Sequence, residues 1–454
     1  MKQILRDHKI LLFPILGSIV LYILFAYHLE REEFILLLTA YTGLFICAYW
    51  LIQHSKVNFW FLAGLGVLLR LLFLPNIPNL SQDFYRFLWD GRLLLQGINP
   101  YLIAPEAYLT AGNEVVPQAR ELYQGMGALN GSHFSNYPPI NQFFYMVTAL
   151  FAKESIVGSV IVLRIIMLLA DVGILYFGRK LLVLLKLPVK NIFWYFLNPF
   201  IIIELTGNLH FEGVMLFFLI LSLYLLFNRK WMGAGLLIGI SISVKLLPLL
   251  LLPLFFKWFY KKEVATALNL TSSFKFYLVV LGTVGLTFAP FLSSEFISNF
   301  AATIGLWFQT FEFNASVYYV IRWIGFETVG WNIIETVGKV LPIIIVLFIL
   351  GLAFFRRNKS LQQLITAMLI AVSFYFLLST TVHPWYVATP LLLSVFTKYK
   401  FPIVWSAMVF LSYAAYGAAG FDENLWLVAL EYSVVIGVAL YEFFMKKEPL
   451  GITT

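Results

Sequence analysis

The chain has few charged residues and almost no cysteine. Only 12% of its 454 residues are charged and 61% are hydrophobic, whereas soluble domains carry about 25% charged residues. This composition excludes a water-soluble enzyme, a disordered protein and a nucleic-acid-binding protein, so we expect no nucleic acid among the partners. The single cysteine, Cys47, can form no disulfide within the chain, and no His/Cys spacing typical of a structural zinc site occurs.

Long apolar runs occupy most of the sequence. A membrane-crossing helix needs about 20 apolar residues, so these runs predict an all-α, polytopic membrane protein of about 12–14 transmembrane helices in one domain, residues 1–454. Several runs are short enough to be half-helices or re-entrant segments. The first run has no small-residue cleavage site, so we expect a membrane helix and no cleaved signal peptide. The predicted spans are 10–27, 34–52, 59–75, 156–178, 191–206, 211–227, 231–244, 246–260, 274–291, 333–355, 361–380, 385–397, 401–417 and 425–445.

Most of the 31 Lys and Arg residues fall on one side of the membrane when these spans alternate from a cytoplasmic N-terminus. Cytoplasmic loops carry such an excess, so we expect both termini in the cytoplasm. Two long segments, 76–155 and 292–332, are then extracytoplasmic loops. The apolar segment 140–152 is too short for a span, and we expect it to lie as a helix at the outer interface.

The densest polar cluster, residues 81–92, lies near the start of the first of these loops. Asp83 follows the third span closely, so we expect it at the membrane surface among aromatic side chains. A carboxylate in that position suits a general base. The alternative is that Asp83 caps a helix and that Asp90 pairs with Arg86 or Arg92.

Two further groups of polar residues are predicted on the same face. Glu204, His210 and Glu212 gather at the turn that ends the fifth span. Ionisable residues at the end of a membrane helix indicate function, although a solvated turn is the alternative. Tyr137 precedes two prolines and either belongs to a rigid corner or stacks on a sugar.

Cations at the outer ends of later spans are candidates for binding an anion. Lys245 is the only cation in an apolar stretch, where a free ammonium is costly, so it needs either a lipid headgroup or a substrate phosphate. His383 lies in an outer turn and is either a satisfied structural residue or a ligand of the same phosphate. Arg322, in the second loop, is a further candidate. Arg70 and Asp171 lie inside spans, and we expect them to pair with each other or with backbone carbonyls.

The order of these motifs resembles the C-type (GT-C) membrane glycosyltransferases. The similar strings are DFYRFLWDGRLLLQGINPY, YPP, LNPFIIIELTGNLHFEG, SVKLLPLLLLP, FNASVYY and HPWY. They extend over nearly the whole chain, from the first outer loop to His383. Within that class the sequence is similar to the bacterial polyprenyl-phosphate-mannose-dependent mannosyltransferases, around glycosyltransferase family 87.

The resemblance implies an enzyme of the GT-C fold that takes mannose from a polyprenyl-phosphate donor on the outer leaflet. The acceptor is then a lipid-linked or cell-envelope glycan. The resemblance makes Asp83 the base and places His383 near the donor phosphate. Many GT-C enzymes carry a pair of acidic residues at this point, but here Gln82 precedes Asp83. We therefore expect neither a divalent metal nor another cofactor.

The candidate residues support a single displacement with inversion. Lys245, His383 and Arg322 would neutralise the phosphate while Asp83 deprotonates the acceptor hydroxyl. The expected substrate contacts are Tyr85, Trp89, Asp90, Tyr137, His210, Glu212, Trp385 and Tyr386. Membrane lipids are the remaining expected partners. The competing prediction is a transporter or flippase of a lipid-linked sugar, whose site would lie near the middle of the membrane, often between inverted repeats. No such repeat is visible, and the unusual residues gather at one face, which favours an enzyme.

Overall fold

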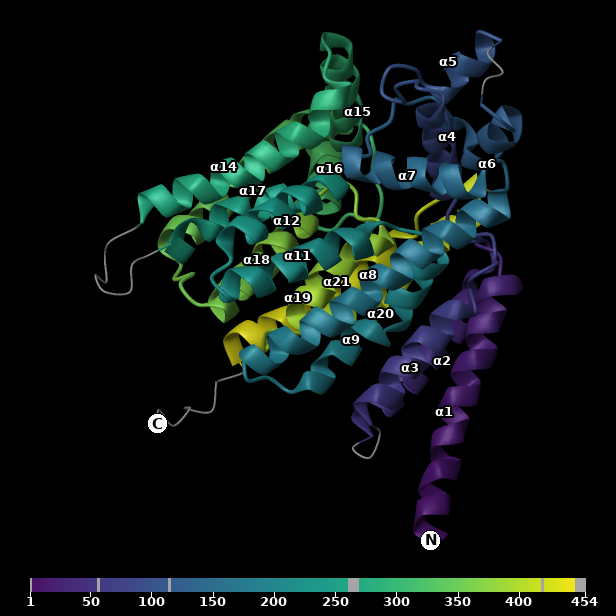
Figure 1. The fold of residues 1–454 in the computed structure, drawn as a ribbon, viewed down its shortest axis with the longest axis vertical. Helices are drawn as coiled ribbons and strands as arrows, with labels where there is room; N and C mark the ends of the chain where they lie inside the picture. Colours follow the sequence, from purple (N-terminus) through teal and green to yellow (C-terminus); the bar gives the residue numbers. More distant parts are fainter. Residues whose placement is uncertain (1, 55–57, 113–115, 260–268, 418–419, 446–454) are drawn as a thin grey trace.

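Helices account for nearly all of the structure (Figure 1). The structure is a computed structural model, and it describes residues 2–54, 58–112, 116–259, 269–417 and 420–445. Within these residues the β-structure consists of a hairpin of β1 (Tyr416–Gly417) and β2 (Gly420–Phe421) and a bridge between Phe313 and Thr381. The predicted all-α fold is confirmed.

The helices fall into four groups along the chain. The first group is α1 (Lys2–Tyr27), α2 (Phe34–Gln53) and α3 (Phe59–Leu71). The second is α4 (Asp83–Leu95), α5 (Pro105–Thr110), α6 (Ala119–Gly131) and α7 (Pro139–Ala152). The third is α8 (Ile156–Leu184), η1 (Val189–Ile192), α9 (Phe193–Phe196), α10 (Pro199–Ile201), η2 (Ile202–Gly207), α11 (Glu212–Phe227), α12 (Trp231–Val244), α13 (Leu247–Leu251), η3 (Leu252–Phe259), α14 (Leu270–Phe288) and η4 (Ala289–Phe291). The fourth is α15 (Ser294–Gln309), α16 (Val317–Val329), α17 (Ile334–Phe355), α18 (Leu361–Leu378), η5 (Pro384–Val387), α19 (Ala388–Ser394), α20 (Phe401–Met408), η6 (Val409–Ala415), α21 (Leu425–Leu440) and η7 (Tyr441–Met445).

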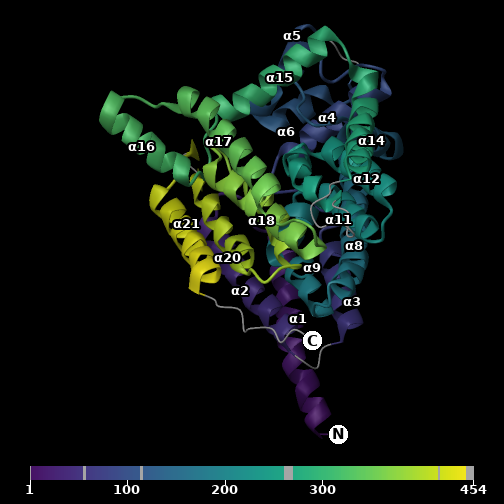
Figure 2. The same ribbon diagram turned by 90° about the vertical axis from the view of Figure 1, so that its left-hand side faces the viewer.

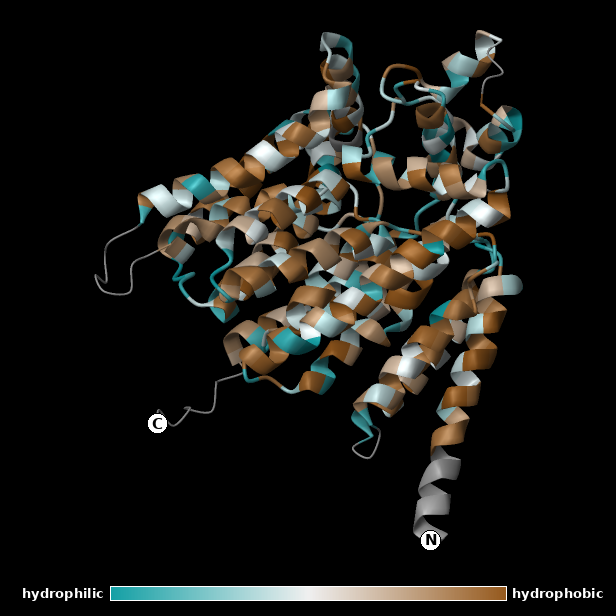
Figure 3. Ribbon diagram, viewed as in Figure 1, coloured by the Kyte–Doolittle hydropathy of each residue, from teal (hydrophilic) through white to brown (hydrophobic). Residues whose placement is uncertain are grey.

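The apolar runs fold into a polytopic membrane protein, as predicted. Six helices among the described residues are long and apolar enough to cross a membrane: α2, α8, α14 with η4, α17, α18 and α21 with η7. Other apolar runs form shorter helices, among them α3, α12, α13 with η3, and α20 with η6. The prediction that several apolar runs are short is therefore confirmed. Figure 3 shows that the helices of this bundle are mainly hydrophobic, whereas hydrophilic residues gather in the connections and in the second helix group.

One predicted pair of spans forms a bent pair of helices, which is either a single broken span or a re-entrant loop. The helices Pro199–Gly207 and Glu212–Phe227 meet at an angle of 113° across a four-residue break. Pro199 begins the first helix because proline suits the first helical turn, and the Asn198 side chain caps it by accepting from the N–H of Phe200. The break leaves His210 outside regular helix, between two apolar elements.

The second group, α4 to α7, forms a lobe at one end of the molecule (Figures 1 and 2). We call residues 83–152 the α4–α7 lobe. Helix α15 lies at the same end, and α1 begins at the opposite end. Helix α7 contains the segment 140–152 and packs on α4 and α8. In Figure 1 it runs across the direction of α1 and lies beside α4 in the lobe.

Charges inside the bundle are paired. Arg70 of α3 and Asp171 of α8 form a buried ion pair, with Nε 2.7 Å from Oδ2. The Tyr195 hydroxyl donates to the same carboxylate at 3.1 Å. Arg164 of α8 donates to backbone carbonyls, including that of Gly207 at 2.8 Å. The predicted pairing is confirmed, and these residues fasten α3, α8 and η2 to one another.

Candidate active site

Asp83 begins helix α4, and its side chain is 25% exposed. Its polar contacts are long. Asn130 Nδ2 donates to Oδ1 at 3.4 Å, and the backbone N–H of Asp83 donates to Ser81 Oγ at 3.4 Å. His210 Nε2 lies 4.0 Å from Oδ2. The carboxylate therefore retains acceptor capacity that no close donor among the described residues occupies.

His210 lies in the break between η2 and α11 and faces Asp83. Its Nε2 is 3.2 Å from Ser81 Oγ, and its Nδ1 is 3.6 Å from Glu204 Oε2. The approach to the break is irregular: η2 is a π-helix, and Leu209 has a φ of 64°. Non-glycine residues rarely adopt this region, and single π-turns concentrate at functional sites. The break thus places the buried imidazole of His210 beside Asp83, at the N-terminal end of α4.

Trp385 packs against two histidines, tilted to one and stacked on the other. Its ring centroid lies 3.7 Å from that of His210 and 4.6 Å from that of His383, the latter pair being parallel within 5°. Tyr386 packs edge-on against His383 at 5.4 Å. The HPWY segment, distant in sequence from the first loop, is therefore part of the group around Asp83.

The turn that carries His383 is fastened to the FNASVYY segment. The N–H of Phe313 donates to the carbonyl of Thr380 at 3.1 Å, and the N–H of Val382 donates to the carbonyl of Phe313 at 2.8 Å. The Phe313 and His383 rings lie 5.3 Å apart. Two motifs that carry the family resemblance are thus joined by direct backbone hydrogen bonds.

His383 is a neutral side chain in this environment. Burial, together with the neighbouring His210, Arg31 and Lys245, lowers the pKa of His383 to about 3. A neutral imidazole offers one N–H donor and one acceptor but no charge. Its contribution to an anion site is therefore a hydrogen bond, and the positive charge must come from other residues.

The charge of Asp83 acts electrostatically on Tyr137. Burial and then the carboxylate of Asp83 raise the pKa of Tyr137 well above its usual value, so the phenol stays protonated. The charge of Asp83 also reaches Tyr386. The Tyr137 backbone carbonyl accepts from the Tyr101 hydroxyl at 2.6 Å, which fixes this corner of the α4–α7 lobe.

Lys245 obtains its anion from the protein. Its Nζ lies 2.7 Å from Oε1 of Glu212, at the start of α11; the two side chains are 24% and 4% exposed. The second carboxylate oxygen of Glu212 is buried and makes no hydrogen bond to the described residues. The charge of Lys245 is therefore already shared with Glu212.

Asp90 pairs with Arg86, which is the alternative that the sequence analysis gave for this residue. It is fully buried, and Arg86 Nε lies 2.8 Å from its Oδ1. Ser135 and Gln142 donate to its Oδ2 at 2.5 and 2.9 Å. These donors occupy the carboxylate and leave no surface for the substrate contact that the sequence also predicted.

Three other predicted contacts lie outside the group around Asp83. Trp89 is fully buried and packs against α5. The ring of Tyr85 lies where a side chain on Gly125 of α6 would stand, so it packs inside the lobe. Arg322 forms an ion pair with Glu312 in the second loop. Each of these side chains packs or pairs with another part of the fold and not with Asp83 at the start of α4.

Arg31 belongs to this region although no motif singles it out. It lies in the turn between α1 and α2, with its guanidinium carbon 3.2 Å from the centroid of the Tyr416 ring. Its charge contributes to the lowered pKa of His383. One signal was available in the sequence: a basic residue in a turn that the span count places outside departs from the positive-inside trend.

Glu204 is also part of the region, as a buried acceptor. The Tyr413 hydroxyl donates to its Oε1 at 2.7 Å, and Asn208 Nδ2 donates to its Oε2 at 3.2 Å. Its position in the outer-turn cluster was visible in the sequence, but its burial was not.

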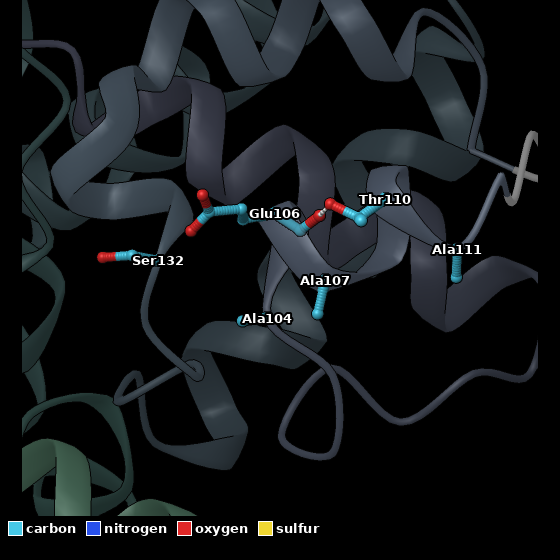
Figure 4. A pocket seen from close by; sticks show the side chains of 6 residues that line it. All are labelled: Ala104, Glu106, Ala107, Thr110, Ala111 and Ser132. Carbon is cyan, nitrogen blue, oxygen red and sulfur yellow. Dashed lines mark hydrogen bonds between the residues drawn. The ribbon is translucent and has the colours of Figure 1, made fainter.

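A separate pocket lies on α5 and at the end of α6 (Figure 4). Its lining consists of Ala104, Glu106, Ala107, Thr110, Ala111 and Ser132. None of the side chains that surround Asp83 lines this pocket. Across the part of the chain that the structure describes, no three His, Cys, Asp or Glu side chains converge to hold a metal ion.

Comparison with known proteins agrees with the motifs. The family described as "Alpha-(1->6)-mannopyranosyltransferase, N-terminal domain" matches residues 14–261. Alpha-(1->6)-mannopyranosyltransferase A of Mycobacterium tuberculosis is 22% identical over 334 residues, which cover 70% of this chain and 61% of that protein. Alpha-(1->6)-mannopyranosyltransferase B of Corynebacterium glutamicum is 27% identical over 149 residues, 33% of this chain and 24% of that protein. The chain thus spans less than two thirds of the length of either relative.

The predicted resemblance to bacterial mannosyltransferases is confirmed by these matches. The matched segment covers more than half of the sequence and contains Asp83, His210, Glu212 and Lys245. On this evidence the chain belongs to the alpha-(1->6)-mannopyranosyltransferase family.

Proposed function

We propose that this protein is an inverting mannosyltransferase that moves mannose from a polyprenyl-phosphate donor to a hydroxyl of a lipid-linked or cell-envelope glycan at the outer face of the membrane. The observation that carries the proposal is the setting of Asp83. It is a partly exposed carboxylate with long polar contacts, adjoining a buried histidine and an aromatic stack. The names of the two relatives support mannose as the sugar.

Asp83 acts as the base. It takes the proton of the acceptor hydroxyl, whose oxygen attacks the anomeric carbon from the face opposite the phosphate. The bond between the anomeric carbon and the phosphate oxygen breaks, and polyprenyl phosphate leaves with the electron pair. His210 lies beside this carboxylate, with Nε2 4.0 Å from Oδ2.

One displacement, and therefore inversion, follows from the state of the other carboxylates. A retaining enzyme needs a second carboxylate as nucleophile. Glu204 is buried and accepts from Tyr413 and Asn208. Glu212 is occupied by Lys245. Among the described residues around Asp83, neither glutamate is free to attack the sugar.

Lys245 and His383 stabilise the departing phosphate. His383 supplies a hydrogen bond as a neutral imidazole, and Lys245 supplies charge that it shares with Glu212. Donors aimed at a developing oxyanion are among the strongest sources of catalysis in acyl and phosphoryl transfer. Trp385, Tyr386 and Tyr137 offer aromatic faces and hydroxyls next to this point for the sugar ring.

The reaction is proposed to need no divalent metal. Gln82 occupies the position where a second acidic residue would complete a pair with Asp83. Metal sites of this kind require several oxygen ligands, and a lone carboxylate with an amide neighbour is a poor donor set.

The outer face is proposed from the distribution of basic residues and the place of the α4–α7 lobe. Both termini are then cytoplasmic. A cysteine at Ala111, an exposed position in the lobe, tests this in a Cys47→Ser background. Membrane-impermeant maleimide should label it in intact cells, while Asn228→Cys in the α11–α12 turn should react only after permeabilisation. The opposite pattern would place the lobe inside.

Transfer is tested directly with purified protein in detergent. Polyprenyl-phosphate mannose and a lipid or glycan extract serve as substrates, with GDP-mannose in place of the lipid donor as a comparison. We expect a mannosylated product with the lipid donor only. The broken span of α10, η2 and α11 favours a flippase as the second candidate, since discontinuous helices line the sites of many transporters. A flippase would make no product in detergent but would move the lipid in vesicles.

A further inference from the structure

Arg31 carries a charge that no carboxylate of the described chain compensates. Its Nε is buried and makes no hydrogen bond to any residue that the structure describes. The acidic neighbours Glu32 and Glu33 are exposed, and Glu33 instead accepts from the backbone N–H of Glu30. The guanidinium is held by the face of Tyr416, at 3.2 Å from the ring centroid. A partly buried, unpaired arginine is costly unless a ligand supplies the anion.

The turn that carries Arg31 is tied to the segment that leads into α4. Asn79 Nδ2 donates to the backbone carbonyl of Phe25 at 2.9 Å and also to that of Leu29. Asn79 is four residues before Asp83, and Leu29 is two residues before Arg31. The α1–α2 turn lies at the end of α1 nearest the α4–α7 lobe in Figure 1. The fold therefore places Arg31 on the same side of the molecule as the base.

A chain of aromatic rings links Arg31 to the HPWY turn. The ring of Tyr416 lies 5.9 Å from that of Phe313, and Phe313 lies 5.3 Å from His383. The charge of Arg31 reaches His383, and both Arg31 and Asp83 act electrostatically on Tyr416. Arg31 thus lies next to Tyr416, a ring that also senses the charge of Asp83 and that is two ring contacts from His383.

The other cations predicted for the phosphate already have anions. Lys245 Nζ lies 2.7 Å from Glu212, and Arg322 is paired with Glu312. His383 is neutral. Among these side chains, Arg31 alone brings an uncompensated positive charge to the region of Asp83.

We propose that Arg31 binds the phosphate of the polyprenyl-phosphate donor. The inference rests on the proposed function. It makes Arg31, in the α1–α2 turn, the main positive charge that binds the donor phosphate. Arginine presents a planar set of N–H donors that matches two phosphate oxygens at once, and the stack on Tyr416 holds that plane before the ligand arrives. His383 adds a neutral donor, and Lys245 adds a shared charge.

Binding of decaprenyl phosphate and of decaprenol to the purified protein tests the assignment without any turnover. The two probes differ only in the phosphate. Wild-type protein should bind decaprenyl phosphate more tightly than the alcohol. Arg31→Gln should lower the affinity for decaprenyl phosphate by about 10- to 100-fold, because a charged hydrogen-bonding pair is lost. Decaprenol binding should stay the same, and Arg31→Lys should recover part of the loss because it keeps the charge.

Arg357→Gln, an exposed arginine in the α17–α18 connection, is the matched control and should bind both lipids as the wild type does. If Arg31→Gln keeps the wild-type preference for the phosphate, the assignment is wrong. If both lipids bind more weakly to Arg31→Gln, its role is structural and the assignment is also wrong. A wild type that prefers the phosphate but transfers no mannose would overturn the proposed function and leave Arg31 as a phosphate ligand.

Discussion

Helix α4 carries two aspartates in opposite circumstances. Asp90, in the second turn of the helix, is fully buried and is held by Arg86, Ser135 and Gln142 within 2.9 Å. Asp83, at the first position, is 25% exposed, and within the part of the chain that the structure describes no side-chain donor lies closer than 3.4 Å. A carboxylate whose oxygens already accept hydrogen bonds from the protein stabilises the fold. A carboxylate with accessible lone pairs is available to bind a substrate.

The largest effect should come from Asp83→Asn. The amide keeps the shape but cannot accept the proton, and a positioned general base contributes about 10²–10⁴ in rate. We expect mannose transfer to fall by that factor with the unfolding temperature unchanged. Initial rates in detergent measure it, and Asp422→Asn, an exposed aspartate beyond the β-hairpin, is the control. An active Asp83→Asn enzyme would end the assignment of Asp83 as base.

Asp90→Asn should instead lower stability. It leaves Arg86 buried without its counter-charge, and breaking one side of a buried ion pair costs about 3–5 kcal/mol. Thermal unfolding of the purified variant should show a clear fall in midpoint, with residual transfer in the protein that remains folded. A stable but inactive Asp90→Asn, together with an active Asp83→Asn, would mean that the roles of the two carboxylates are reversed.

Lys245 and His383 extend the same comparison to the donor site. His383→Ala should lower turnover by about 10²-fold, in line with the loss of one donor to a developing oxyanion, and leave the fold intact. Lys245→Ala should lower both turnover and unfolding temperature, because it strands the buried carboxylate of Glu212. Rates and unfolding midpoints measured on the same preparations separate the two outcomes. Wild-type turnover in both variants would place the phosphate elsewhere.

A smaller effect is expected in the pH dependence of stability. His383 has a pKa near 3 in the folded protein against an ordinary value of 6.5. Between these values the unfolded chain binds a proton that the folded one does not, so stability falls as pH drops below 6.5 and is flat above it. One proton accounts for at most about 1.4 kcal/mol per pH unit. His383→Gln should therefore lose less unfolding temperature than the wild type between pH 6.5 and 5; equal losses would contradict a buried neutral histidine.

The smallest effect should follow metal removal. If Asp83 works as a lone base beside Gln82, chelation leaves the transfer rate unchanged. Rates with EDTA, and with EDTA followed by Mg²⁺ or Mn²⁺, check this. Loss of activity on chelation and recovery with one ion would show that the carboxylate is a metal ligand instead.

Only part of the site was predictable, because the burial and the partners of each side chain depend on segments that are distant in sequence. Asp83, Tyr137, His210, Glu212, Lys245, Trp385, Tyr386 and His383 lie in loops or at span ends that the sequence indicated, and the fold gathers them. Trp89, Tyr85 and Arg322 satisfied the same criteria of residue type and position. Their partners, on α5, on α6 and at Glu312, come from segments whose approach no local pattern encodes. Arg31 was overlooked for the same reason, since its partner Tyr416 is far along the chain.

The sequence by itself determined the fold class, the apolar helical segments and the family, because apolar length and motif order are local properties of the chain. It also predicted that Arg70 and Asp171 pair with each other or with backbone carbonyls, and the structure shows the first of these. Only the tertiary structure decided which aspartate of α4 is saturated, that Glu212 occupies Lys245, and that the break before α11 turns His210 toward Asp83. These outcomes depend on distances between elements far apart in sequence, and electrostatic and hydrogen-bonding energies are set by those distances.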